Sequence, residues 1–188
     1  MRNKGVITLC ECAVMLALAF ALSYVRLWKM PLGGSVTLAS MLPIMLIAVK
    51  HGTKVGIGTA FVYSLTQLLQ GIIEGDIYWA MEPKVFIIAV LFDYIVPFTV
   101  LGLSGLFKVH GEPGVYLGMG MSVFFRFVCH YFTGVSIWRQ WCPEGWIAEV
   151  YSLAYNGGYL LPDFIILLIV AVLMLRVGEI RKLLGIRQ

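Results

Sequence analysis

The chain has 188 residues, of which 60% are hydrophobic and only 13% carry a charge, and its mean hydropathy is +0.89. An ordinary soluble domain has about 25% charged residues, so this composition excludes a soluble globular protein. The net charge of +4 comes from basic residues spread over several short loops, which argues against nucleic-acid binding. We predict one membrane-embedded domain over residues 1–188.

The apolar runs predict about six transmembrane helices, since roughly 20 residues of helix cross a bilayer. The expected spans are residues 6–28, 36–50, 54–72, 84–107, 114–137 and 151–176. The first span follows two basic residues, as a signal peptide would. Its apolar run is longer than the roughly 7–15 residues of such a region, so we expect it to be retained. The predicted fold class is an all-α integral membrane protein.

The basic residues outside these spans predict that both termini are cytoplasmic. Nine would then lie inside, namely Arg2, Lys4, Lys50, Lys54, Lys108, Arg176, Arg181, Lys182 and Arg187. Four would lie outside, namely Arg26, Lys29, Lys84 and Arg139. The outer loops are rich in acidic and aromatic residues, namely Glu74, Asp76, Tyr78, Trp79, Glu82, Trp138, Trp141, Glu144, Trp146 and Glu149. We expect a solute to meet the protein at this outer face in a multi-pass cell-membrane protein.

Small residues recur in the first, third and fifth spans. Ala13, Ala17 and Ala21 form a smooth stripe on the first helix, which lets another helix approach closely. That helix could belong to a partner protein or to the same bundle. The glycines near the start of the third span and in the fifth are open to the same two interpretations, and for them packing within the bundle is favoured. They are Gly52, Gly56, Gly58, Gly114, Gly118 and Gly120.

Motifs of enzymes and of metal or nucleotide sites are absent from the sequence. The four cysteines lack the spacing of a metal site or a disulfide framework, and neither a phosphate-binding loop nor a zinc-protease motif occurs. We therefore expect no cofactor, no metal and no catalysis. Transport against a gradient would take its energy from an ion gradient or from another subunit.

The fifth span carries two ionisable residues on one face, Arg126 and His130, which lie four residues apart. An ionisable group inside a membrane is costly and usually faces a cavity, a partner or a ligand. Arg126 therefore needs an internal anion or an acceptor on a ligand, and Asp93 and Asp163 are the carboxylates available within the spans. The alternatives are a structural ion pair for Arg126 and a hydrogen-bonded core histidine for His130.

Asp93 is followed by Tyr94 in the fourth span, within reach of an outward-facing cavity. A carboxylate ringed by aromatic side chains suits an organic cation, because ring faces attract positive charge. Tyr151, Tyr155 and Asn156 open the sixth span at the same level, and an amide offers the donor and acceptor that a heterocycle edge requires. The competing interpretation of the aromatic residues is the belt found at any membrane interface.

Four strings of the chain resemble a known family. GGSVTLASMLPI (33–44), LFDYIVPFTVLGLSGLF (91–107), RFVCHYFTGVSIW (126–138) and YSLAYNGGYLLPD (151–163) are similar to the thiamine-specific substrate-binding (S) component of energy-coupling factor transporters. The resemblance implies a six-helix membrane protein that binds thiamine from outside. It also implies a membrane coupling protein and two cytoplasmic ATPases as partners.

Several site residues are implied by this resemblance. Asp93 would face the positive or amino-bearing part of thiamine with Tyr94 beside it, and Arg126 and His130 would match a basic residue and a histidine of the family site. Trp138 would match a stacking tryptophan, and Tyr151 and Asn156 would match contacts to the heterocycle. Ala13 and Ala17 would match a stripe that docks the coupling protein.

The chain also departs from the family pattern. Some members carry glutamate at the position of Asp93 and lysine at that of Arg126, which changes reach and hydrogen-bond geometry but not charge. An aromatic residue in the first outer loop of some members has no counterpart here, and Tyr63 could supply a ring instead. The alternatives are an S component for another heterocyclic vitamin or a thiamine precursor, a small proton-coupled transporter of aromatic cations, and a membrane enzyme with His130 and Asp93 as acid and base.

Overall fold

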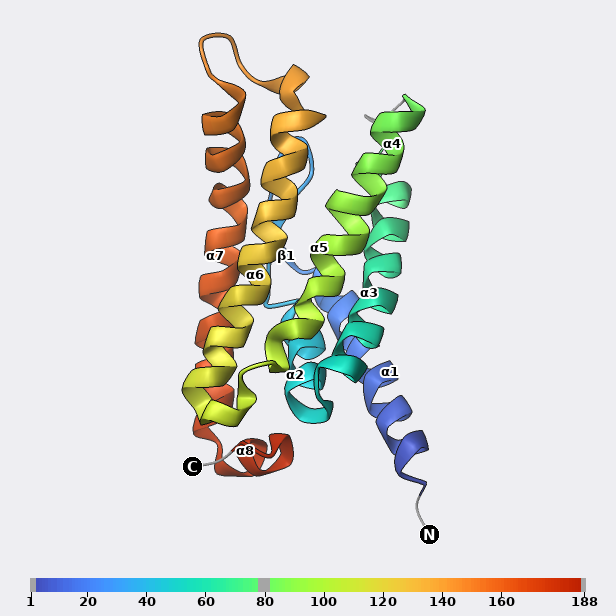
Figure 1. Ribbon diagram of the computed structural model, residues 1–188, viewed down its shortest axis with the longest axis vertical. Coiled ribbons are helices and arrows are strands. Elements are labelled where there is room, and N and C mark those ends of the chain that lie inside the picture. The colour runs from blue at the N-terminus through green and yellow to red at the C-terminus, as the bar shows by residue number, and fades with distance from the viewer. Residues whose placement is uncertain (1–2, 78–81, 187–188) are drawn as a thin grey trace.

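The computed structural model describes residues 3–77 and 82–186. Both termini lie at the same end of the molecule (Figure 1). The regular α-helices are α1 (Lys4–Ser23), α2 (Leu42–His51), α3 (Thr53–Glu74), α4 (Pro83–Ala89), α5 (Val96–Thr99), α6 (Gly111–Ser136), α7 (Ala148–Arg176) and α8 (Gly178–Leu184). The predicted all-α membrane fold with both termini on one side is confirmed.

Four helical segments of the described chain are long and apolar enough to cross a membrane: Lys4–Ser23, Thr53–Glu74, Pro83–Ser136 and Ala148–Arg176. The third segment doubles back and supplies two rods, one ending near Gly105 and the other formed by α6 (Figure 1). With the short α2, the bundle has the expected six rods. Arg2, Tyr78, Trp79 and Arg187 lie outside the described residues.

The fourth rod is not one regular α-helix, as its sequence suggested. After α4 it continues as a π-helix, η1 (Val90–Ile95), then as α5, and then as a 3-10 helix, η2 (Val100–Gly105). Two further 3-10 turns are η3 (Lys108–His110) and η4 (Arg139–Trp141). We attribute this change of helix type to Pro97, because its ring nitrogen cannot donate a hydrogen bond to the carbonyl of Asp93 four residues earlier.

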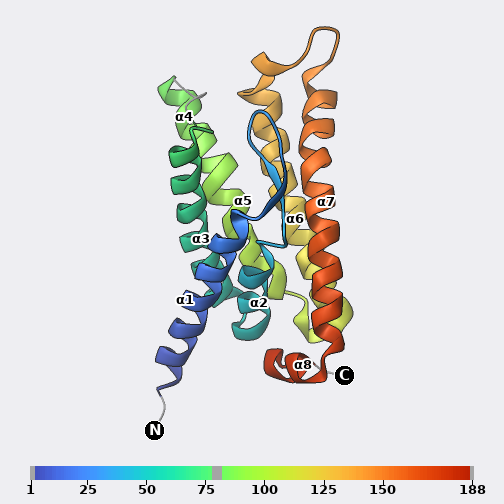
Figure 2. The ribbon, with the colours of Figure 1, turned by 180° about the vertical axis from the view of Figure 1, so that it is seen from behind.

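A two-stranded antiparallel hairpin separates the first two helices, where the sequence predicted the ends of two spans. Its strands are β1 (Arg26–Lys29) and β2 (Ser35–Thr37), paired in the register Arg26↔Thr37, Trp28↔Val36 and Lys29↔Ser35. Figure 2 shows the hairpin rising beside α6 toward the end opposite the termini. Gly33 and Gly34 turn the chain at positive φ angles of 92° and 80°, which glycine adopts without a steric cost.

The core of the bundle is built around α2. This helix has 10 residues, so it is about 15 Å long and too short to cross a bilayer. Its residues from Leu42 to Val49 are buried, and they pack with Leu101, Met119 and Leu167 from the surrounding helices. The apolar run that predicted a second span is therefore a central core helix, enclosed by the longer rods.

Close helix packing explains one of two glycines near the start of the third span. A Cβ on Gly56 would lie 2.4 Å from the Cβ of Ala48 and 2.8 Å from the carbonyl oxygen of Gly102, whereas a Cβ on Gly58 would meet nothing within 4 Å. We expect Gly56→Ala to destabilise the protein by roughly 1–3 kcal/mol through overpacking. Gly58→Ala should be neutral or gain up to about 1 kcal/mol from helix propensity.

Thermal unfolding of both variants in detergent would measure this difference. The Gly58→Ala variant is the matched control, since it adds the same methyl group two residues away on the same helix. An equal unfolding temperature for the two variants would contradict the packing explanation for Gly56.

Candidate ligand-binding site

A cavity of about 180 Å³ lies between the hairpin and the outer halves of α3, η1, α6 and α7. Seven of the eight predicted ligand-binding residues line it, namely Asp93, Tyr94, Arg126, His130, Trp138, Tyr151 and Asn156. The eighth, Tyr63, does not line it: its side chain is fully buried and packs edge-on against the ring of Phe98, with the ring centroids 5.6 Å apart. Phe98 stands on the cavity wall in its place.

The π-helix η1 positions Asp93 and Tyr94. Within it the backbone N–H of Val96 donates to the carbonyl of Leu91, five residues earlier. Such widened turns occur mostly as single insertions in α-helices, frequently at functional sites. Tyr94 packs across Gly71 of α3, where a Cβ would lie 2.3 Å from the tyrosine oxygen. The sequence predicted both residues but not this backbone.

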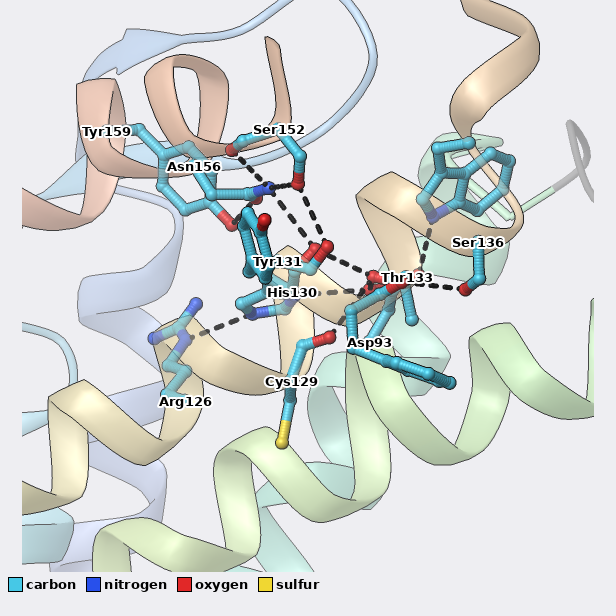
Figure 3. A network of polar contacts seen from close by, with 12 residues as sticks. Asp93, Arg126, Cys129, His130, Tyr131, Thr133, Ser136, Ser152, Asn156 and Tyr159 are labelled. Atoms are coloured by element: carbon cyan, nitrogen blue, oxygen red, sulfur yellow. Dashed lines mark hydrogen bonds and ion pairs between the residues drawn. The ribbon is translucent and has the colours of Figure 1, made fainter. Parts of the chain in front are cut away.

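Asp93 is held by three hydrogen-bond donors from α6 and the turn that follows it (Figure 3). The Trp138 indole nitrogen donates to Oδ2 over 2.8 Å, and the Thr133 hydroxyl donates to Oδ1. Nδ1 of His130 lies 3.2 Å from Oδ1. These donors fix the orientation of the carboxylate at the cavity wall. Trp138 was predicted as a stacking residue, and in this structure its N–H group also orients Asp93.

Arg126 and His130 share one face of α6, as their spacing predicted. Nε of Arg126 donates to Nε2 of His130 over 3.4 Å, so the proton of a neutral imidazole lies on Nδ1, which faces Asp93. The ring of His130 thus connects the cation to the carboxylate without a direct ion pair between them.

Two partners were expected for Arg126, an internal anion or an acceptor on a ligand, and the described residues place no anion in contact with it. Among residues 3–77 and 82–186, no carboxylate lies within 4.0 Å of its guanidinium group. The guanidinium carbon lies 4.2 Å from the ring centroid of Phe98, and Nη1 donates to the sulfur of Met41 over 2.8 Å. A cation–π contact stabilises the charge only in part. Arg126 therefore suits an acceptor group on a ligand in the cavity.

Asn156 joins α7 to α6 (Figure 3). Its amide nitrogen donates to the carbonyls of His130 and Ser152 over 3.2 and 3.0 Å, and its amide oxygen accepts from the Tyr159 hydroxyl over 3.2 Å. Because the protein already uses both ends of this amide, Asn156 first of all sets the position of His130. A role at a heterocycle edge stays a prediction.

Three tyrosines form a row along the cavity side of α7. Tyr151, Tyr155 and Tyr159 follow at four-residue spacing, with neighbouring ring centroids 5.7 and 6.3 Å apart. Of these, Tyr151 was expected to contact a ligand, and Tyr155 was expected at the same outer level of the helix. The four-residue spacing of Tyr159 on the same helical face could have identified it as well.

The same row fixes the hairpin over the cavity. The Tyr155 hydroxyl donates to the carbonyl of Gly33 over 2.8 Å and accepts from the backbone N–H of Leu32 over 3.1 Å. Tyr159 packs against Gly34, where a Cβ would lie 2.8 Å from its ring. The hairpin turn therefore docks on α7 through backbone hydrogen bonds at Leu32 and Gly33 and through a ring contact that leaves no room for a side chain at Gly34.

Asp163 anchors the other end of the hairpin. Its Oδ1 accepts from the backbone N–H of Thr37 over 2.7 Å and from the Thr37 hydroxyl over 2.9 Å. The sequence suggested this carboxylate as a partner for Arg126. The structure instead uses it to hold β2 against α7.

Charged residues connect β1 to the outer end of α3. Glu74 accepts from both terminal nitrogens of Arg26, and the Lys29 ammonium lies 2.9 Å from Glu74 and 3.3 Å from Asp76. The hydrogen bonds to Glu74 raise the pKa of Arg26 and of Lys29 above their ordinary values. The cavity is therefore bordered by a hairpin fixed on α3 at one side and on α7 at the other.

The alanine stripe of α1 faces outward. Ala13, Ala17 and Ala21 are exposed, and only 6% of the apolar window in α1 is buried. Packing within the chain's own bundle therefore does not explain these three alanines.

Comparisons with known proteins identify the family. Residues 9–182 match the model of the family described as thiamine transporter protein. The chain belongs to this family. It is 32% identical to the thiamine transporter ThiT of Bacillus subtilis (strain 168), with 92% of each chain covered. It is 25% identical to ThiT of Lacticaseibacillus paracasei, over 94% of this chain and 90% of the other.

A solved structure of ThiT from Listeria monocytogenes has the same fold. Its TM-score is 0.73 at 24% identity, with 95% of this chain and 98% of the other covered. The predicted resemblance to a thiamine transporter family and the multi-pass membrane location are both confirmed. Membership in a family of transporters also confirms that the chain is not an enzyme.

Proposed function

We propose that this protein binds thiamine in the cavity and takes it up across the cell membrane as the S component of an energy-coupling factor transporter. The observation that carries this proposal is the Asp93 carboxylate, fixed by three donors in an aromatic-lined cavity of a chain from the thiamine transporter family. A permanent cation such as a thiazolium needs a counter-charge when it leaves water, and aromatic faces add to it.

The remaining cavity residues suit the neutral parts of the ligand. Arg126 has no carboxylate within 4.0 Å in the described chain, so its donors suit an acceptor nitrogen or oxygen of the heterocycle. Trp138 and Tyr151 offer ring faces for stacking, and Tyr94 closes the side toward α3. Asp93 would balance the thiazolium charge while these groups orient the molecule.

The uptake step requires partners. A membrane coupling protein and two cytoplasmic ATPases would supply the energy, and the loaded protein, acting as one domain over residues 1–188, would reorient within the membrane to release the vitamin inside. The exposed stripe of Ala13 and Ala17 suits the coupling protein, because small side chains let two helices approach closely.

A tryptophan-fluorescence titration tests ligand binding. The purified protein in detergent would be titrated with thiamine, with riboflavin and biotin as controls for other vitamins. Saturable quenching by thiamine alone is expected, since Trp138 lines the cavity. Failure of thiamine and its precursors to bind, with the protein folded, would contradict the proposal and point to another heterocyclic vitamin.

Tyr155→Phe should increase the dissociation rate of thiamine roughly 5- to 10-fold. The change removes the hydroxyl that forms hydrogen bonds with the backbone of Gly33 and Leu32. A net loss of about 1 kcal/mol corresponds to this increase in the dissociation rate. Release would be followed as stopped-flow recovery of tryptophan fluorescence after dilution to a thiamine concentration well below the dissociation constant.

The matched control is Tyr131→Phe, which removes a hydroxyl from the partly buried ring next to Phe127 on α6. It should leave the release rate unchanged. If the two variants release thiamine at the same rate, the hairpin contact with Tyr155 does not retain the ligand.

A further inference from the structure

Glu11 is the only acidic residue of α1, and it does not line the cavity. It stands among apolar side chains in a helix that is long and apolar enough to cross the membrane. An ionisable group in such a place is costly and usually faces a partner. Its role is therefore separate from contact with the ligand.

Two basic residues at the inner end of α2 hold this carboxylate. The Lys50 ammonium donates to Oε1 over 2.8 Å, and Nε2 of His51 lies 2.6 Å from Oε2. We name these contacts the Glu11 bridge. The three side chains are partly buried, with exposed fractions of 33% for Glu11, 21% for Lys50 and 17% for His51. The bridge joins α1 to a helix whose residues from Leu42 to Val49 are buried in the core.

The outer half of α1 has an attachment of its own. The buried residues of this helix are Ala19 and Ser23, and the Ser23 hydroxyl donates to the side chain of Gln70 on α3 over 2.9 Å. Figure 2 shows the inner half of α1 running away from the other rods toward the N-terminus. Glu11 and Ser23 lie about 18 Å apart along the helix at 1.5 Å per residue, so these two polar attachments fix the direction of its axis.

The bridge also fixes how α1 is rotated about its axis. Glu11, Met15 and Ala19 follow at four-residue spacing, and this face is turned toward the bundle. Ala13 and Ala17 are exposed and lie on the other side, since a step of two residues turns a helix by about 200°. A carboxylate that is anchored inward therefore keeps the alanine stripe pointing outward.

We propose that the Glu11 bridge positions α1 for docking of the coupling protein, which makes Glu11 a positioning residue for uptake. This inference rests on the proposed function, in which Ala13 and Ala17 receive the partner. Small residues let two helices approach closely only when the helices cross at a suitable angle, so docking depends on the tilt and rotation of α1. The cavity lies toward the other end of the molecule, and ligand binding should not depend on the bridge.

A distance measurement on the purified full chain tests the bridge without ligand or partner. Spin labels would be placed at two exposed residues, Leu9 of α1 and Leu117 of α6, after serine has replaced the four native cysteines. With Glu11 in place, the distance between the labels should show one narrow distribution. Glu11→Gln should broaden it, because the inner half of α1 loses its polar attachment. An unchanged distribution would overturn the proposal.

Uptake by cells that contain the coupling module tests the consequence for docking. Glu11→Gln should reduce thiamine uptake at least about fivefold, which corresponds to about 1 kcal/mol of docking free energy. The affinity of the purified variant for thiamine should change less than twofold. Glu179→Gln is the matched control, since Glu179 is an exposed acid of α8 that pairs with Lys182 over 2.8 Å. An equal loss of uptake in this control would contradict a specific role of Glu11.

Exchanging the two charges separates the bridge from its single residues. Glu11→Lys alone and Lys50→Glu alone each bring like charges together, and both should lose uptake. The double variant restores a pair of opposite charges and should recover uptake; recovery no better than that of either single variant would count against the bridge. Absence of thiamine binding by the wild-type protein would refute the proposed function, whereas normal uptake in Glu11→Gln would refute only the role of the bridge.

Discussion

Replacing Asp93 with asparagine is expected to weaken thiamine binding roughly 10- to 100-fold. The change removes the counter-charge of the cavity, and interactions with a charged group contribute about 1.5–3 kcal/mol. It also replaces one carboxylate oxygen by an NH2 group. The remaining amide oxygen cannot accept hydrogen bonds from both Trp138 and His130, which contact different oxygens of Asp93. The measurement is the dissociation constant from tryptophan-fluorescence quenching.

Two controls make this result specific. Asp93→Glu keeps the charge and should retain most of the affinity, since the longer side chain can still reach a cation in the cavity. Glu144→Gln removes an exposed acid of the outer loop and should change the affinity less than twofold. Unchanged affinity in a folded Asp93→Asn protein would end the counter-charge role.

Most of the bundle follows from the sequence, because hydrophobic length is a direct signal of a membrane helix. The exceptions have local causes. The residues from Arg26 to Thr37 contain enough apolar side chains to extend two predicted spans, yet Gly33 and Gly34 form a turn and the strands on either side pair. A hairpin that is docked on α7 by long-range contacts leaves no periodic pattern in its own sequence.

The candidate site shows the same division between local and long-range information. Arg126 and His130 lie on one face because both belong to one regular helix, so their spacing was enough to predict it. The partners of the charges were not predictable. Asp93 accepts hydrogen bonds from Thr133 and Trp138, and Asp163 accepts from Thr37. These partners are brought together by tertiary packing, which the separation of residues in the sequence does not reveal.

Tyr63 illustrates a limit of arguments from residue type. A tyrosine in a membrane helix was expected to supply an aromatic ring that contacts the ligand. In the structure the cavity wall at this level is formed by Phe98, and Tyr63 packs behind it in the core. Which of two adjoining aromatic rings reaches a cavity depends on how the helices pack against each other, and residue type does not encode it.

Replacing Ala13 and Ala17 with leucine is expected to reduce thiamine uptake at least tenfold while changing the binding affinity less than twofold. Both residues are exposed on α1, so larger side chains meet no neighbour in the chain's own bundle, but they would hold a partner helix away. Uptake of labelled thiamine by cells that contain the coupling module, together with fluorescence titration of the purified protein, would separate the two effects.

Ala154→Leu is the matched control, since Ala154 is an exposed alanine on α7 and receives the same change in volume. It should retain uptake. Loss of binding and uptake together in the Ala13 and Ala17 variant would mean that the stripe supports the fold of this chain. Normal uptake would mean that the coupling protein docks elsewhere. The predicted outcome, binding without uptake, would assign the exposed face of α1 to the partner, because a defect confined to uptake leaves the cavity intact.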